Sequence, residues 1–96
     1  MNFEWDERKA LINQDKHGVS FQEARTVFYD EYGLIIPDPD HSELEDRFLI
    51  LGRSESLRLL VVCHCYRQDD QTIRLISARK ATKHESGYYR AGRRGL

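Results

Sequence analysis

The chain has 96 residues, of which 40% are hydrophobic and 32% are charged. This length predicts one domain over residues 1–96, and the composition is typical of a soluble globular protein, not of a disordered chain. No run of 18 apolar residues and no apolar N-terminal stretch of signal length occurs, so we expect no membrane span, no secretion signal and a cytoplasmic location.

The net charge of −1 is unevenly distributed along the chain. Residues 73–96 hold seven basic residues and one acidic residue, a charge of +6, whereas residues 1–72 hold eight basic and fifteen acidic residues, a charge of −7. Such polarity favours a basic surface that binds a polyanion. The alternative is that the basic tail is only solvated or contacts an acidic partner.

The first third of the chain predicts a short strand followed by two helices. "NFEW" is extended and aromatic, and Asp6 is a suitable N-cap for a helix that ends before Gly18. On this helix one face carries the polar residues Lys9, Asn13 and Lys16, and we expect Leu11 and Ile12 to point toward the core. "SFQE" is a capping box that starts a second helix through "FQEARTVFYD".

The remainder predicts a sheet and a final helix. Four β-like segments are separated by polar turns, namely "YGLIIP", "EDRFLILG", "LRLLVVCHCYR" and "TIRLISAR". "TKHE" is a second capping box, with Gly87 and Gly92 weakening the helix that follows. The pattern therefore predicts an α+β domain: a short N-terminal strand, two helices, an antiparallel four-stranded meander and a C-terminal helix.

The hairpin formed by the last two strands ends in arginines on both sides. Strict alternation groups Val61, Cys63 and Cys65 with Arg67 on the first strand, and Ile73, Leu75 and Ser77 with Arg79 on the second. With an odd loop, Arg67 lies opposite Ile73, Arg79 lies opposite Val61, and all share one face. With an even loop the two arginines lie on opposite faces, and the sequence does not decide between these registers.

Two arginines on one rigid face suit a phosphate group, because guanidinium donors bind it in a bidentate manner. RNA cleavage requires in addition a base for the 2′-OH, and the candidates are Glu45 and His17. Further RNA contacts are expected from Lys9, Lys16, Arg47 and Ser77. The structural alternatives remain open: a surface salt bridge for each arginine, an ion pair between Glu45 and Arg47, and a helix-capping role for His17.

The two cysteines indicate neither a disulfide nor a metal site. Cys63 and Cys65 lie at positions i and i+2 of a strand, too far apart to bridge without distortion, and no second ligand pair follows. We expect both to be buried small residues and expect no metal or other cofactor.

Several segments resemble the BrnT toxin family of bacterial type II toxin–antitoxin modules. They are "FEWDERKALINQDKHGVSFQEA", "DHSELEDRFLILGRS", "RLLVVCHCYR" and "IRLISARKATKHE", which occur in the family's order. The resemblance implies a RelE-like fold and ribonuclease activity that halts translation and arrests growth. It also implies a BrnA-like ribbon-helix-helix antitoxin, with operator DNA bound only through that antitoxin.

Carried over residue by residue, the resemblance covers most of the candidates. Its motifs match Lys9, Asn13, Lys16 and His17 on the first helix, Glu45 and Arg47 in its E-x-R segment, His64 and Arg67 on the long strand, and Arg79 in "SAR". Cys65 and Tyr66 depart from the pattern, because threonine and glutamate are usual there. The short, glycine-containing last helix departs as well.

These observations predict a metal-independent endoribonuclease toxin in which Arg67 and Arg79 hold the scissile phosphate and Glu45 or His17 is the base. The alternative is a non-catalytic protein that acts as antitoxin-binding partner and co-repressor. Direct DNA binding is not expected, since no predicted helix has a densely basic face.

Overall fold

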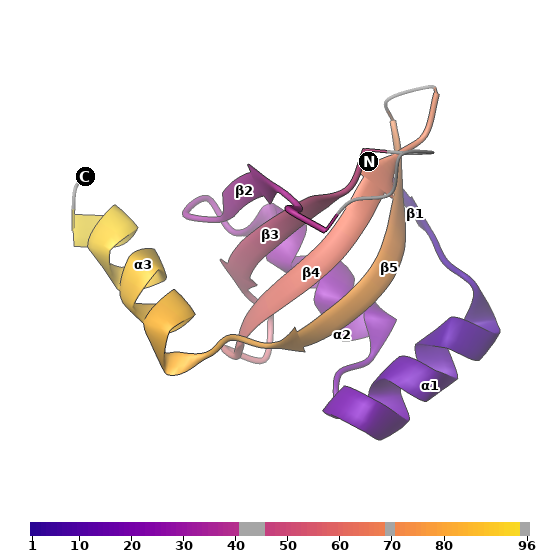
Figure 1. Cartoon of the computed structure of the whole chain (residues 1–96), viewed down its shortest axis with the longest axis horizontal. Helices are drawn as coiled ribbons and strands as arrows, with labels where there is room; N and C mark the ends of the chain where they lie inside the picture. The colour runs from indigo at the N-terminus through magenta and orange to yellow at the C-terminus, as the bar shows by residue number, and fades with distance from the viewer. Residues whose placement is uncertain (41–45, 69–70, 95–96) are drawn as a thin grey trace.

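The computed structural model describes residues 1–40, 46–68 and 71–94. Its elements in chain order are β1 (Asn2–Glu4), α1 (Glu7–His17), α2 (Phe21–Ala24), the 3₁₀ helix η1 (Arg25–Tyr29), β2 (Leu34–Pro37), β3 (Phe48–Arg53), β4 (Leu59–Tyr66), β5 (Thr72–Lys80) and α3 (Lys83–Arg94) (Figure 1). The predicted α+β class is confirmed.

The strands form one mixed sheet in the order β1-β5-β4-β3-β2. The neighbouring pairs from β2 to β5 are antiparallel, whereas β1 runs parallel to β5 through residues 2–4 and 72–74. The predicted sheet of four strands is therefore incomplete, because the N-terminal segment joins it as a fifth strand.

The helix boundaries follow from local capping chemistry. The Asp6 carboxylate accepts hydrogen bonds from the backbone N–H groups of Arg8 and Lys9, and Gly18 ends α1 in the left-handed region at φ +69°. Ser20 caps α2 through the N–H of Glu23. Thr82 caps α3 through the N–H of Glu85, so both predicted capping boxes start helices. The helix that Ser20 starts passes into η1 after one turn.

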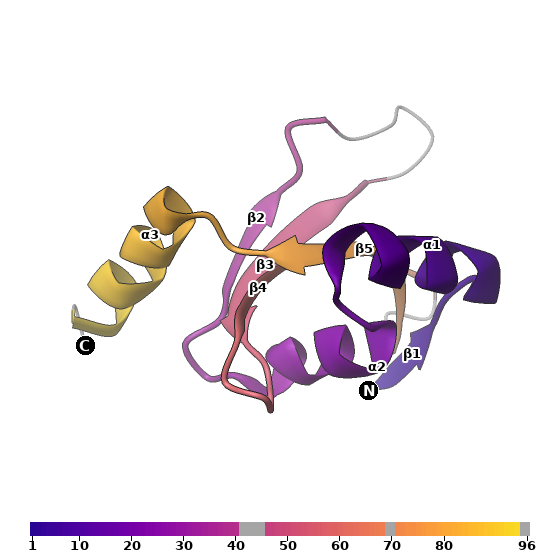
Figure 2. The same cartoon turned by 90° about the horizontal axis from the view of Figure 1, so that it is seen from below.

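The core lies between the sheet and α1, α2 and η1. Phe21, Val27, Leu60 and Val62 are fully buried there, and Ile73, Leu75 and Ala78 from β5 join them. Figure 2 shows α1 and α2 together against the sheet, with α3 standing apart from them. We call the sheet surface turned away from α1 and α2, which carries Cys65, Ser77 and Arg79, the outer face.

The predicted orientation of two residues on α1 is wrong. Leu11 and Ile12 are 69% and 60% exposed, whereas Asn13 is buried. The buried side of α1 includes Ala10 and Asn13, and Leu11 and Ile12 point away from it.

Candidate nucleic-acid interface

The register of β4 and β5 decides which arginines share a face. Val61 pairs with Arg79 and Cys63 with Ser77, but a β-bulge follows, so that His64 pairs with Leu75 and Cys65 with Arg74. The pairing of β3 with β4 is regular over the same stretch, so the extra residue, Ile76, belongs to β5. Arg74 and Arg79 therefore lie on the same face although they are five residues apart.

This bulge overturns the predicted alternation of β5. Ile73 and Leu75 were expected beside Arg79, yet they are only 5% and 2% exposed and belong to the core on the opposite face. Arg74, expected on that opposite face, lies on the outer face level with Cys65. Sequence reasoning missed Arg74 because one inserted residue reverses every later position of a strand.

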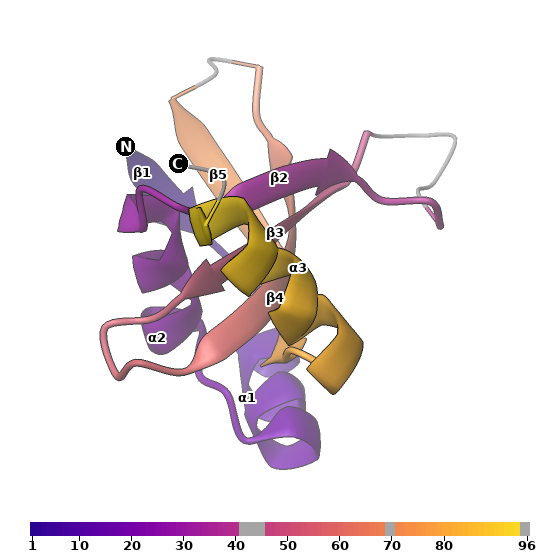
Figure 3. The ribbon, with the colours of Figure 1, turned by 90° about the vertical axis from the view of Figure 1, so that its left-hand side faces the viewer.

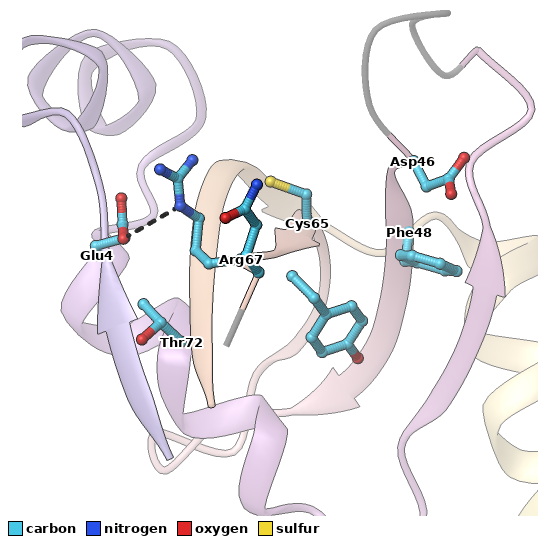
Figure 4. A pocket seen from close by; sticks show the side chains of 8 residues that line it. Glu4, Asp46, Phe48, Cys65, Arg67 and Thr72 are labelled. Atoms are coloured by element: carbon cyan, nitrogen blue, oxygen red, sulfur yellow. Dashed lines mark ion pairs between the residues drawn. The ribbon is translucent and has the colours of Figure 1, made fainter. Parts of the chain in front are cut away.

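Arg67 continues the outer-face positions of β4 beyond the end of the strand. Its backbone N–H donates to the carbonyl of Thr72, and Ile73 pairs with Tyr66, so Arg67 does not lie opposite Ile73 as an odd loop would have placed it. The Nε atom of Arg67 lies 3.6 Å from a carboxylate oxygen of Glu4. Figure 4 shows both side chains at the same pocket, with Cys65 nearby.

Arg67 and Arg79 share a side of the hairpin but not a position along it. Arg79 is level with Val61, six residues before Arg67, and this separation corresponds to roughly 20 Å at about 3.3 Å per residue. The structure therefore does not bring the two residues to one position of the sheet, because their backbones lie at opposite ends of β4. The outer face instead presents arginines at successive levels.

Carboxylates of the same chain orient these guanidinium groups. Arg79 donates to both oxygens of Glu85 at 2.7 and 2.9 Å, and Arg74 donates to Glu4 at 2.7 Å. The hydrogen bonds from Arg79 lower the pKa of the Glu85 carboxyl to about 2, and the N–H of Thr82 adds to this effect. Each arginine is therefore held in place by an acid that RNA would have to displace or share.

Helix α1 lies along the edge of β5 that β1 leaves uncovered. The amide of Asn13 donates to the carbonyl of Ala78 at 2.9 Å and accepts from its N–H at 3.0 Å, as a neighbouring strand would. Lys9 and Lys16 share the helix face of Asn13 and are exposed. Two basic side chains therefore flank the β5 edge.

We call Arg79, Arg74 and Arg67, which lie at successive levels of the outer face, the arginine row. The two ends of α1 lie at different ends of this row. Near the start of α1, the Lys9 N–H lowers the pKa of Asp6, and the charge of Arg74 adds a smaller effect in the same direction. Asp6 therefore lies toward the Arg74 end of the row. At its end, the carbonyl of Gly18 accepts a hydrogen bond from Arg58, one residue before β4 begins. Half-buried His17 precedes Gly18, so it lies toward the Arg79 end.

The remaining candidates fall into three situations. Glu45 lies outside the described residues. Arg47 directly precedes β3 and lies close to the outer face, because its charge acts on Cys63 of that face. Burial raises the pKa of the Cys63 thiol to about 12, and the positive charge of Arg47 opposes this rise. Ser77 is exposed between the levels of Arg74 and Arg79. Both cysteines are buried, as predicted, and neither belongs to a disulfide.

His64 belongs to the core and not to the interface. It is fully buried, its ring lies edge-on to Phe28 at 4.8 Å, and burial lowers its pKa. Its ring nitrogens lie 3.2 Å from the carbonyl of Val62 and 3.4 Å from the hydroxyl of Tyr66. His64 is therefore neutral at physiological pH and supports the position of Tyr66.

A polar pocket of about 750 Å³ opens at the Arg67 end of the sheet (Figure 4). It is lined by Glu4, Asp46, Phe48, Cys65, Tyr66, Arg67, Gln68 and Thr72. The rings of Phe48 and Tyr66 lie 5.5 Å apart, so the pocket combines an aromatic wall with hydrogen-bonding groups.

Within residues 1–40, 46–68 and 71–94, no group of three or more histidine, cysteine, aspartate or glutamate side chains is placed to hold a metal ion. Within the same ranges, no helix has the length and apolar character needed to cross a membrane.

The chain is similar to one described family and to solved structures of known proteins. The family model described as "Ribonuclease toxin, BrnT, of type II toxin-antitoxin system" matches residues 5–85. Among solved structures, a crystal structure of the Brucella abortus ribonuclease toxin BrnT is 24% identical and has a TM-score of 0.67, covering 86% of this chain and 99% of that chain. A comparison with curated proteins gave no match.

Proposed function

Because the chain belongs to the family of BrnT ribonuclease toxins of type II toxin–antitoxin systems, we propose that the outer face of its sheet binds and cleaves RNA. The observation that carries this proposal is the row of arginines that the β5 bulge creates, with Arg79, Arg74 and Arg67 at successive levels of one face. An RNA strand lying along this row meets a cation at several phosphates, and phosphate contacts dominate such affinity.

The scissile phosphate is assigned to Arg79. In the reaction the 2′-oxygen forms a bond to phosphorus while the bond to the 5′-oxygen breaks, and negative charge builds up on the phosphoryl oxygens. A bidentate guanidinium on a rigid strand stabilises that charge, and exposed Ser77 adds a hydroxyl two residues away. Arg67 and Arg74 then hold a neighbouring part of the strand, with Lys9, Lys16 and Arg47 as further contacts.

The base that removes the 2′-proton is proposed to be His17 or Glu45. His17 is supported by its position at the end of α1 that lies toward Arg79. Tyr66 stands where glutamate is usual in the family, and burial raises its pKa, so its hydroxyl keeps its proton at physiological pH. It does not replace a carboxylate base.

The cleavage is proposed to need no metal ion, since arginines supply the positive charge that a metal would supply elsewhere. The direct test is incubation of the purified chain with total RNA in EDTA. We expect cleavage by the parent and by Arg25→Ala, which removes an exposed arginine from η1, and a loss of about 100-fold or more in Arg79→Ala.

Circular dichroism verifies the fold of each variant. Cleavage by Arg79→Ala at the parent rate would exclude the assignment of Arg79. Cleavage that appears only when Mg²⁺ is restored would exclude metal independence. Growth arrest on expression in cells provides the corresponding measurement where cleavage requires the ribosome.

One observation favours the alternative, a protein that binds its antitoxin without cleaving RNA. Arg79 and Arg74 are already paired with Glu85 and Glu4 in the free chain, as structural ion pairs would be. A parent chain that binds the antitoxin but neither cleaves RNA nor arrests growth would support this second function.

The remaining parts of the proposal concern the setting of this activity. The family implies an antitoxin and an RNA target. We propose that the antitoxin is BrnA-like, with a ribbon-helix-helix domain through which the complex contacts operator DNA. We further propose a cytoplasmic toxin that acts as a single domain with a RelE-like arrangement of its sheet.

A further inference from the structure

The pocket of about 750 Å³ at the Arg67 end of the arginine row has an aromatic wall that the proposed cleavage does not use. The wall forms because β4 is longer than its neighbour. The pairing of β3 with β4 ends at Phe48 and His64, whereas β4 continues to Tyr66. The rings of Phe48 and Tyr66 lie 5.5 Å apart at the pocket. Beside an arginine that binds phosphate, aromatic rings of this kind suit the base of a nucleotide.

Tyr66 is held in place from the core side without being covered by the protein. Its ring lies edge-on to fully buried His64 at 5.3 Å, and its hydroxyl lies 3.4 Å from a ring nitrogen of His64. Yet Tyr66 remains 40% exposed. A ring that is already fixed stacks on a base with little further loss of side-chain freedom, and every base offers a face for stacking. The aromatic wall therefore supplies affinity, and selection among bases depends on the polar groups of the pocket.

The carboxylates of the pocket differ in the partners that they already have. Two of the described side chains that line it are carboxylates, and Figure 4 shows them on opposite sides, Glu4 near Arg67 and Asp46 near Phe48. Glu4 is paired with Arg74 at 2.7 Å and with Arg67 at 3.6 Å. Asp46 is exposed and belongs to neither of these ion pairs. Asp46 is therefore the carboxylate that a ligand in the pocket meets.

A carboxylate distinguishes guanine from the other three bases. The Watson–Crick edge of guanine has two adjacent donors, N1–H and the N2 amino group, which bind the two oxygens of one carboxylate. Adenine and cytosine place an unprotonated ring nitrogen beside the amino group, and uracil flanks its single N–H with two carbonyl oxygens, so each of them brings a lone pair toward the carboxylate. Exposed Gln68, which lines the same pocket, carries an amide that donates to O6 of guanine.

We propose that this pocket binds a guanine base of the RNA substrate, an inference that rests on the proposed function and adds a base preference to it. Tyr66 and Phe48 contact the face of the base, and Asp46 accepts hydrogen bonds from its N1–H and N2 amino group. Arg67 holds an adjoining phosphate. Because the backbones of Arg67 and Arg79 lie roughly 20 Å apart along β4, the guanine lies a few nucleotides away from the scissile phosphate.

The test measures binding by fluorescence anisotropy with three short 2′-O-methyl RNAs, which are all uridine except for one central guanosine, adenosine or cytidine. We expect the parent to bind the guanosine RNA about 10-fold more tightly than the other two, as one bidentate contact to a base provides. Asp46→Asn is expected to remove this preference, because an amide presents a donor to the N–H groups of guanine. Asp15→Asn, at an exposed position of α1 outside the pocket, is the matched control and should keep it.

Two substitutions of Tyr66 separate stacking from packing. Tyr66→Leu is expected to weaken binding of the guanosine RNA about 10-fold, because one stacked base is lost. Tyr66→Phe keeps the ring and loses only the hydroxyl, so it is expected to bind like the parent. Urea denaturation measures the stability of both variants. A Tyr66→Leu chain that is less stable but binds this RNA like the parent would identify Tyr66 as a packing residue and overturn the stacking role.

The outcomes distinguish failure of this pocket from failure of the proposed function. Equal binding of the three RNAs by the parent, or a guanosine preference that Asp46→Asn retains, would overturn the guanine pocket. If the same parent preparation still cleaves total RNA, the proposed function stands and the pocket alone is excluded. A parent that neither binds these RNAs nor cleaves total RNA contradicts the proposed function, and the pocket with it.

Discussion

Asn13 illustrates how one side chain completes a sheet. The sequence places it on one face of the first helix with Lys9 and Lys16, and the structure places its amide against the backbone of Ala78 and the carbonyl of Val19. The uncovered edge of β5 needs a donor and an acceptor, and an asparagine amide supplies both. Asn13 therefore positions α1, and its lysine neighbours, beside the arginine row.

Asn13→Ala is expected to lower the free energy of unfolding by about 2–4 kcal/mol, because it leaves the buried N–H and carbonyl of Ala78 without these partners. Urea denaturation monitored by circular dichroism measures this change. Gln14→Ala, at the exposed neighbouring position, is the control and is expected to stay within about 0.5 kcal/mol of the parent. Equal stability of the two variants would contradict the edge-partner role.

Glu85 predicts a pH dependence of stability. Its folded pKa of about 2 is below its ordinary value of 4.5, so its contribution is present above pH 4.5 and is lost as the pH falls toward 2. Glu85→Gln is therefore expected to be less stable than the parent at pH 6, with the difference shrinking at pH 3 and below. Urea denaturation at several pH values checks this. A difference in the free energy of unfolding that is constant with pH would refute it.

At the scale of elements, the sequence predicted what depends on local chemistry and failed where register matters. The Asp6 cap, the two capping boxes and the four β-like segments were readable because side-chain identity and periodicity determine them. The bulge at Ile76 was not readable, since an isoleucine in a strand carries no sign that it is the extra residue. The parallel pairing of β1 was hidden because it joins segments 70 residues apart.

The bulge makes a specific prediction for Arg74. Arg74→Ala is expected to weaken RNA binding and to reduce the slope of log affinity against log salt by about 1, because one phosphate contact is lost from the outer face. Arg25→Ala, on η1, is the matched control and should leave the slope unchanged. Fluorescence anisotropy with a labelled RNA at several salt concentrations measures both. An unchanged slope in Arg74→Ala would remove Arg74 from the interface.

At the scale of the whole molecule, the charge polarity of the sequence becomes a difference between faces. One face of the sheet is closed by α1, α2 and η1 over an apolar core, and the outer face carries arginines from β4 and β5 together with basic α3, which crosses this side of the sheet in Figure 3. From the acidic part of the sequence, Glu4 lies at this face, and its carboxylate contacts Arg74 and Arg67. The account therefore requires RNA on the outer face.

The most direct test is an NMR titration of the labelled chain with a short 2′-O-methyl RNA, which lacks the nucleophilic hydroxyl and stays intact. The account predicts amide shift changes around Arg67, at Arg74 and from Ser77 to Lys80, with little change in α2 and η1. Changes confined to residues 21–29, with β4 and β5 unaffected, would contradict it.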